Sequence, residues 1–171
     1  MPTIQLPVRS IIRGQSIGGT TGYPSLKRAY SGQNPLAFFE LLVFPYRQAN
    51  AVPRAHWQFR LPDDYASGGT VKILWVANVT SGDVKWQARV AAITPADADT
   101  PWQHAFAAAA TVTTAVNATE ARRLVESSIT LTMDSAAAGD LILLQLYRDP
   151  ADAADTANAD AEVASVAFVY A

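Results

Sequence analysis

Most of the sequence after residue 35 follows one pattern, in which short runs of alternating apolar and polar residues are separated by turn-forming residues. Residues 55–61, for example, place Trp57, Phe59 and Leu61 on one side of the chain and polar residues on the other. Side chains alternate between the two faces of a β-strand, so this period of two predicts strands with one buried face. The density of such runs predicts an all-β domain, a jelly-roll-like β-sandwich of about eight strands.

The expected strands share this alternation or an apolar run. They cover residues 36–44, 55–61, 70–78, 83–94, 102–106, 111–116, 124–133, 141–147 and 162–170. A short loop with Gly82 joins the third run to the fourth, which predicts a β-hairpin. Trp75 and Trp86 then fall in or near the same core. Only residues 117–127 have local helix character, of about two to three turns at most.

The first 35 residues differ from the rest of the chain. They hold five of the nine glycines and four of the ten prolines, and only residues 4–12 keep a short regular period. We therefore expect an extended N-terminal arm over residues 1–35, laid on a surface, followed by a sandwich domain over residues 36–171. A disordered tail is the alternative, but the many apolar residues of this segment argue against it.

Charge is sparse and unevenly placed. Only 16% of the residues are charged, against roughly 25% in ordinary soluble domains. Residues 1–60 contain seven basic residues and one acid, whereas residues 61–171 contain six basic residues and fourteen acids. This predicts a basic leading segment, an acidic body and a surface that another molecule partly covers. The basic groups are too sparse, and not interleaved with aromatic residues, for nucleic-acid binding to be expected.

Composition excludes several classes of protein. The chain has no cysteine, which rules out disulfides and thiolate metal sites. No apolar run approaches the roughly 20 residues that a membrane-spanning helix needs, so no membrane partner is expected. The N-terminus lacks the hydrophobic stretch of a secretory signal, which predicts synthesis in a cytosol.

The sequence offers little material for catalysis. Residues 14–18 match the G-x-S-x-G string of serine hydrolases, but that motif needs a helix after the serine, and glycine-rich sequence follows here. His56 and His104 are the only histidines, and we expect both at the surface or an interface. We therefore expect no enzyme and no cofactor, and a hydrolase on a β-sandwich is the weakest hypothesis.

An acidic segment follows residue 148. Asp149, Asp152 and Asp155 are spaced three residues apart, and one hypothesis is that their carboxylates converge on a cation. The alternative is a solvated loop whose carboxylates cap turns and pair with Arg148.

Three segments carry a resemblance to a known family: TVKILWVANVTSGDVKWQARVAAI, GDLILLQLYRD and DAEVASVAFVYA. Over roughly residues 55–171 the chain resembles the β-sandwich virion proteins of tailed bacteriophages, above all the capsid decoration (cement) proteins. The resemblance implies a jelly-roll body, commonly a homotrimer, with an arm that binds the major capsid protein and stabilises the head. It also implies a place on the outer surface of the capsid, after synthesis in the host cytoplasm.

On this hypothesis the N-terminal arm, residues 1–35, makes the contacts with the capsid lattice. Its apolar residues supply buried contact and its cations align with carboxylates. The residues expected in these roles are Ile4, Leu6, Val8, Arg9, Ile11, Ile12, Arg13, Lys27 and Arg28. Deletion of residues 1–30 should then leave a folded body that no longer binds capsids.

The alternative hypothesis is a receptor- or carbohydrate-binding module of a phage fibre or spike. Trp57, Tyr65, Trp102 and His104 would offer stacking faces to such a ligand. The competing interpretation of the tryptophans is packing in a core or a trimer interface.

Overall fold

The computed structural model describes residues 1–8, 12–13, 24–31, 34–46, 52–96, 101 and 104–171. Among these residues it contains strands and connecting segments and no α-helix. The strands are β1 (Thr3–Leu6), β2 (Ile12–Arg13), β3 (Ser25–Ser31), β4 (Asn34–Phe44), β5 (Arg54–Arg60), β6 (Thr70–Ala77), β7 (Asp83–Ile93), β8 (Ala110–Ala115), β9 (Val125–Thr130), β10 (Leu141–Arg148) and β11 (Ala161–Val169). The predicted all-β class is confirmed.

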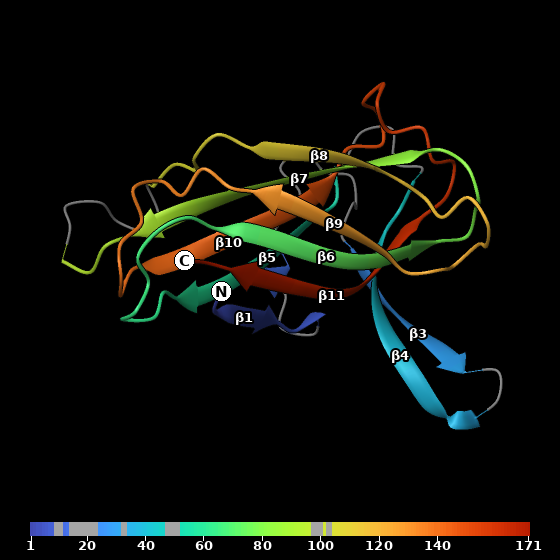
Figure 1. Cartoon of the computed structure of the whole chain (residues 1–171), viewed down its shortest axis with the longest axis horizontal. Helices are drawn as coiled ribbons and strands as arrows, with labels where there is room; N and C mark the ends of the chain where they lie inside the picture. The colour runs from blue at the N-terminus through green and yellow to red at the C-terminus, as the bar shows by residue number, and fades with distance from the viewer. Residues whose placement is uncertain (9–11, 14–23, 32–33, 47–51, 97–100, 102–103) are drawn as a thin grey trace.

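The strands form two antiparallel sheets that pack face to face (Figure 1). One sheet has the order β3-β4-β11-β6-β9, with β1 also paired to β11, and the other has the order β2-β5-β10-β7-β8. Without β1, β2 and β3, the orders are β4-β11-β6-β9 and β5-β10-β7-β8. Most successive strands in this set cross from one sheet to the other, which is the arrangement of an eight-stranded jelly roll. The predicted jelly-roll-like sandwich is therefore confirmed.

The predicted hairpin between residues 70–78 and 83–94 is wrong. β6 pairs with β11 and β9, whereas β7 pairs with β10 and β8 in the facing sheet. The loop between them carries the chain across the sandwich, so both strands direct their apolar faces into one interior. Trp75 and Trp86 meet there with ring centroids 5.7 Å apart, which confirms their shared core. Period-two alternation shows which face is buried and not which strand is the neighbour.

Two further expectations differ from the structure. Residues 117–127 form no helix, because the Asn117 side chain accepts hydrogen bonds from the backbone N–H groups of Thr119 and Glu120 and holds a turn. Residues 104–106 of the expected strand 102–106 are not in a strand, and the other two lie outside the described residues.

The core lies between the two sheets. Its largest members are fully or almost fully buried: Trp57, Trp75, Trp86, Phe44 and Phe168. The indole N–H of Trp75 donates to the Ser127 hydroxyl at 2.9 Å, which satisfies one of the few polar groups at this depth.

The first eight residues of the chain are part of the sandwich. β1 pairs with β11, and Leu6 is 5% exposed within the core. The carbonyl oxygen of Pro7 accepts a hydrogen bond from the Trp57 indole at 3.0 Å. The expectation that residues 1–35 are laid on a surface is therefore wrong at Leu6. The division between an arm and a body at residue 35 stays a prediction.

β3 and β4 form a two-stranded ribbon that extends away from the sandwich (Figure 1). β4 pairs with β11 only over Leu42–Phe44. Within the described chain, most of β4 therefore has β3 as its sheet partner.

Candidate functional site

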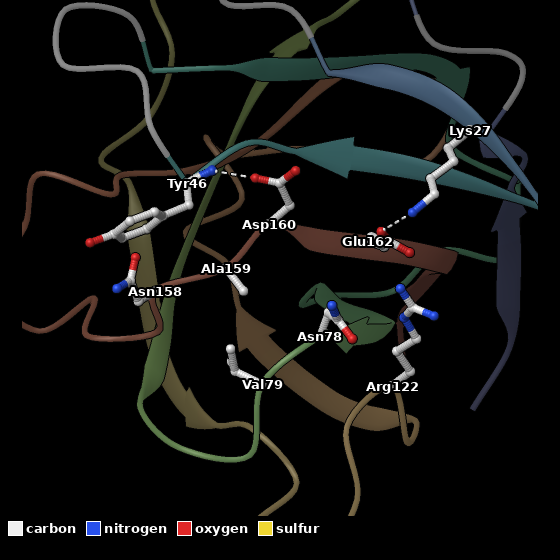
Figure 2. Close-up of a pocket in the computed structure, with 9 residues that line it drawn as sticks. All are labelled: Lys27, Tyr46, Asn78, Val79, Arg122, Asn158, Ala159, Asp160 and Glu162. Carbon is white, nitrogen blue, oxygen red and sulfur yellow. Dashed lines mark hydrogen bonds and ion pairs between the residues drawn. The ribbon is translucent and has the colours of Figure 1, made fainter.

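A hollow of about 510 Å³ lies beside the base of this ribbon (Figure 2). Its lining comes from β3, β11 and four connecting segments of the chain. The lining residues are Lys27, Tyr46, Asn78, Val79, Arg122, Asn158, Ala159, Asp160 and Glu162.

Strand register explains why residues so far apart in the sequence meet here. Ala161 of β11 pairs with Phe44 of β4 on one side and with Ala77 of β6 on the other. The end of β4, the end of β6 and the start of β11 therefore lie side by side at one edge of the sandwich. The residues just beyond these three positions, such as Tyr46 and Asn78, are brought together by the register alone.

Both acidic side chains that line the hollow are held by other groups of the protein. The Lys27 ammonium lies 2.5 Å from an oxygen of the mostly buried Glu162 carboxylate. The Asp160 carboxylate accepts a hydrogen bond from the backbone N–H of Tyr46 at 2.9 Å. These contacts join the ribbon, the end of β4 and the start of β11 around the hollow.

Three polar side chains of the hollow are left available. Within the described part of the chain, no ion pair or side-chain hydrogen bond engages Asn78, Asn158 or the guanidinium of Arg122. Arg122 has a positive φ of 65°, and its backbone N–H donates to the carbonyl of Ala77 at 2.7 Å. That contact fixes the β8–β9 connection against the end of β6. Figure 2 shows Arg122 and Asn78 across the hollow from Tyr46 and Asn158.

Arg148, which is fully buried, stabilises the β10–β11 connection that lines the hollow. Its guanidinium donates two hydrogen bonds to the Asp155 carboxylate, at 2.6 and 2.8 Å. It also donates to the carbonyls of Ala157 at 2.8 Å and Ala159 at 2.6 Å, and it lies 5.8 Å from the centroid of the Tyr46 ring. Arg148 thus holds the β10–β11 connection, and it also lies against the aromatic ring of the hollow.

The acidic segment matches the capping and pairing alternative, except that the Arg148–Asp155 pair is buried and not solvated. Asp155 binds Arg148, and Asp149 accepts a hydrogen bond from the backbone N–H of Ala151. A hydrogen bond from the Lys85 ammonium, together with smaller contributions, lowers the pKa of the Asp152 carboxyl below its ordinary value of 3.8. Over the described residues, no three or more histidine, cysteine or acidic side chains group as metal ligands would.

Two of the expected stacking residues are buried in the core. Trp57 is 2% exposed and Tyr65 is 7% exposed, so the prediction that they present faces to a ligand is wrong. Their rings lie in the core because their strand and turn direct them inward, as the competing interpretation proposed for the tryptophan. His104 lies 2.8 Å from a carboxylate oxygen of Asp134. Trp102 is outside the described residues.

The described residues do not bring the G-x-S-x-G string and the histidines together in a catalytic site. Residues 14–18 lie outside them. The other histidine, His56, contacts the side-chain amide of Gln145 at 2.5 Å on the face of the second sheet that is turned away from the core.

The apolar residues predicted to bind a partner lie mainly against the core. Leu6 is a core residue, and Ile4 and Val8 pack against the core while half-buried. Ile12 is in β2, and Ile11 lies outside the described residues. Their role in binding a partner stays a prediction.

The basic residues predicted for the same role are divided. Lys27 lines the hollow, and Arg28 forms an ion pair with Glu40 across the ribbon at 3.7 Å. Arg13 is in β2, and Arg9 lies outside the described residues. Their role in binding also stays a prediction.

The site residues expected from the sequence do not include Tyr46, Asn78, Arg122 or Asn158. Each lies in a segment between strands, and nothing in its local sequence distinguishes it from other loop residues. The available signal was positional, since Tyr46 comes just after the expected strand 36–44 and Asn78 ends the expected strand 70–78. Using that signal requires knowing that the ends of these strands are neighbours.

Several solved structures are similar to this chain. A carbohydrate-binding module specific for non-crystalline cellulose, CBM28, is 12% identical, with a TM-score of 0.53 over 90% of this chain and 86% of that chain. The module CBM27-1 of Caldicellulosiruptor saccharolyticus, solved with mannohexaose, is 9% identical, with a TM-score of 0.46 over 98% and 96%. The enzymatically active domain of tailspike protein 4 of bacteriophage CBA120 is 10% identical, with a TM-score of 0.41 over 88% of this chain and 18% of that chain.

The likeness to CBM28 agrees with the β-sandwich fold. No protein-family model and no curated protein sequence matches the chain. None of the three structures named above is a capsid decoration protein. Among the described residues there is no helix with the length and apolar character needed to span a membrane.

Proposed function

We propose that this chain is a non-catalytic module that binds a carbohydrate in the hollow beside Tyr46. One observation carries the proposal: an open hollow at the edge of the jelly roll combines an aromatic ring with amide and guanidinium groups that no other described residue engages. The fold shared with the cellulose-specific module is consistent with this function, and the residues of the hollow supply the argument for it.

The chemistry of the hollow suits a hydroxyl-rich ligand. A sugar ring presents apolar C–H faces and hydroxyl groups that both donate and accept hydrogen bonds. The ring of Tyr46 offers an apolar surface with a polar tip. The amides of Asn78 and Asn158 donate and accept, and Arg122 donates several hydrogen bonds from one planar group.

The arrangement favours binding over catalysis. The carboxylates of Asp160 and Glu162 are the acidic groups of the hollow, and each already contacts a donor of the protein. Glycoside hydrolysis needs two carboxyl groups that are free to exchange protons or to attack the sugar. Here we infer that both carboxylates shape the hollow by holding Tyr46 and Lys27 in place.

Substitution of Tyr46 tests the proposal. The protein is screened on an array of plant and bacterial glycans, and affinities are measured by calorimetry with cellohexaose, xylohexaose and mannohexaose. We expect binding to at least one saccharide and an affinity loss of roughly tenfold or more in Tyr46→Ala, since a buried aromatic contact is worth on the order of 1.4 kcal/mol or more. Tyr46→Phe should retain most of the affinity.

The matched control is Leu124→Ala, which removes an exposed apolar side chain from the β8–β9 connection outside the hollow. It should bind as the unmodified protein does. Failure to bind any saccharide, or equal affinities for Tyr46→Ala and Leu124→Ala, would overturn the proposal.

The biological setting rests on the sequence resemblance alone. We propose a phage fibre or spike as the setting that accords with carbohydrate binding. The capsid decoration role, with the major capsid protein as partner, a homotrimer and a place on the virion surface, stays a prediction from that resemblance. Co-sedimentation with capsid shells and the mass of the protein in solution test it.

A further inference from the structure

The ribbon of β3 and β4 carries an exposed aromatic side chain, Phe39, which is 66% exposed. It is the most exposed aromatic side chain among the described residues whose burial is known. An isolated exposed apolar residue is ordinary in a soluble protein. The position of Phe39 relative to the hollow is the feature that requires explanation.

Strand register places Phe39 on the same face of the ribbon as a residue of the hollow. Ala29 pairs with Phe39, and Lys27 pairs with Leu41. Directly opposed residues share a face, and so do residues two apart in one strand. Phe39 therefore lies on the face that carries Lys27, about 7 Å farther along the ribbon at roughly 3.4 Å per residue.

The face of the ribbon that carries Phe39 is also the face that borders the hollow. Val43 pairs with Glu162, so Val43, Leu41 and Phe39 follow one another on the face that bears the Lys27–Glu162 ion pair. Val43 and Leu41 are buried, whereas Phe39 is not. The register thus places the Lys27–Glu162 ion pair of the hollow and Phe39 on one face of the ribbon.

The opposite face of the ribbon carries a different set of residues. Leu26 pairs with Leu42, and Leu42 is fully buried in the core, so this face is the one that turns inward where the ribbon joins the sandwich. The Arg28–Glu40 ion pair lies on it, and Leu26 at its edge is 42% exposed. Leu26 is therefore an exposed apolar residue of the same ribbon that does not face the hollow.

We propose that the Phe39 face of the ribbon extends the binding site, so that the ligand is an extended saccharide chain and not a single sugar. The chain would occupy the hollow beside Tyr46, pass the Lys27–Glu162 ion pair and stack a sugar ring on Phe39. This inference rests on the proposed carbohydrate binding. Stacking on an exposed ring adds affinity only for ligands long enough to reach it.

The test compares short and long ligands by calorimetry on the full chain. The probes are cellobiose with cellohexaose, xylobiose with xylohexaose and mannobiose with mannohexaose. We expect a hexasaccharide to bind at least tenfold more tightly than its disaccharide. Phe39→Ala should weaken hexasaccharide binding about fivefold to tenfold and leave disaccharide binding unchanged. The matched control, Leu26→Ala, should change neither affinity.

The outcomes separate the two proposals. If Phe39→Ala leaves hexasaccharide binding unchanged, or weakens it no more than Leu26→Ala does, the extended site is wrong. In that case a loss of binding in Tyr46→Ala still supports the hollow. If hexasaccharide and disaccharide bind equally, the extended site is also wrong. If none of the six probes and no array glycan binds the unmodified protein, both proposals fail.

Discussion

At the scale of single residues, Arg148 illustrates the requirements of a buried charge. Removing a guanidinium from water is costly, and the cost is offset only when its donors find partners. Arg148 meets this condition with Asp155 and two carbonyl groups of the β10–β11 connection. The same connection contributes Asn158 and Asp160 to the hollow. Stability and site geometry therefore depend on one side chain.

Substitution Arg148→Met should destabilise the protein by about 3–5 kcal/mol, because it leaves the buried Asp155 carboxylate and two carbonyls without their donor. Urea unfolding measures the loss. Arg123→Met, at an exposed arginine, is the control and should change the unfolding free energy by less than about 0.5 kcal/mol. Equal unfolding midpoints for the two variants would contradict this account.

At the scale of elements, the β6–β7 loop is held close to the β10–β11 connection. Gly82 has a φ of +97°, and a Cβ at this position would lie 2.7 Å from the carbonyl oxygen of Thr156 and 2.7 Å from the Cα of Ala157. No side chain fits there. Glycine thus permits the close approach of two loops that both line the hollow.

Gly82→Ala should therefore destabilise the protein through both backbone strain and overlap, by roughly 2–4 kcal/mol in all. Gly68→Ala separates the two causes, since Gly68 also has a positive φ, +67°, but nothing lies within 4 Å of its added Cβ. The Gly68→Ala variant should lose only about 1 kcal/mol of its free energy of unfolding. Thermal unfolding of both variants gives the comparison, and equal losses would show that the loop contact is unimportant.

At the scale of the whole molecule, the leading residues close the sandwich. β1 covers one end of β11, Leu6 fills the core, and Pro7 supplies the acceptor for the buried Trp57 indole. An arm that merely lies on a partner would leave the body intact when removed. The contacts of β1 predict the opposite.

Leu6→Ala should lower the free energy of unfolding by about 2–4 kcal/mol, because the smaller side chain leaves a cavity in the core. Deletion of residues 1–8 should cost more, since it also removes the partner of Trp57. Thr3→Ala, at an exposed position of the same strand, is the control and should be nearly neutral. Chemical unfolding measures all three. If the deletion variant is as stable as the full chain, residues 1–8 act as the separate arm that the sequence alone predicted.

Sequence pattern by itself determined most of the strands after residue 35 and which of their faces are buried. The alternations around Trp57, Trp75 and Trp86 predicted three core residues, because the two faces of a strand differ in exposure wherever the chain folds. Only the tertiary structure decided which strands are neighbours, and it separated β6 from β7. The hollow depends on that choice, since Tyr46 and Asn78 meet only when β4 and β6 both pair with β11. Burial is largely a local property of the pattern, whereas strand partners result from competition across the whole chain.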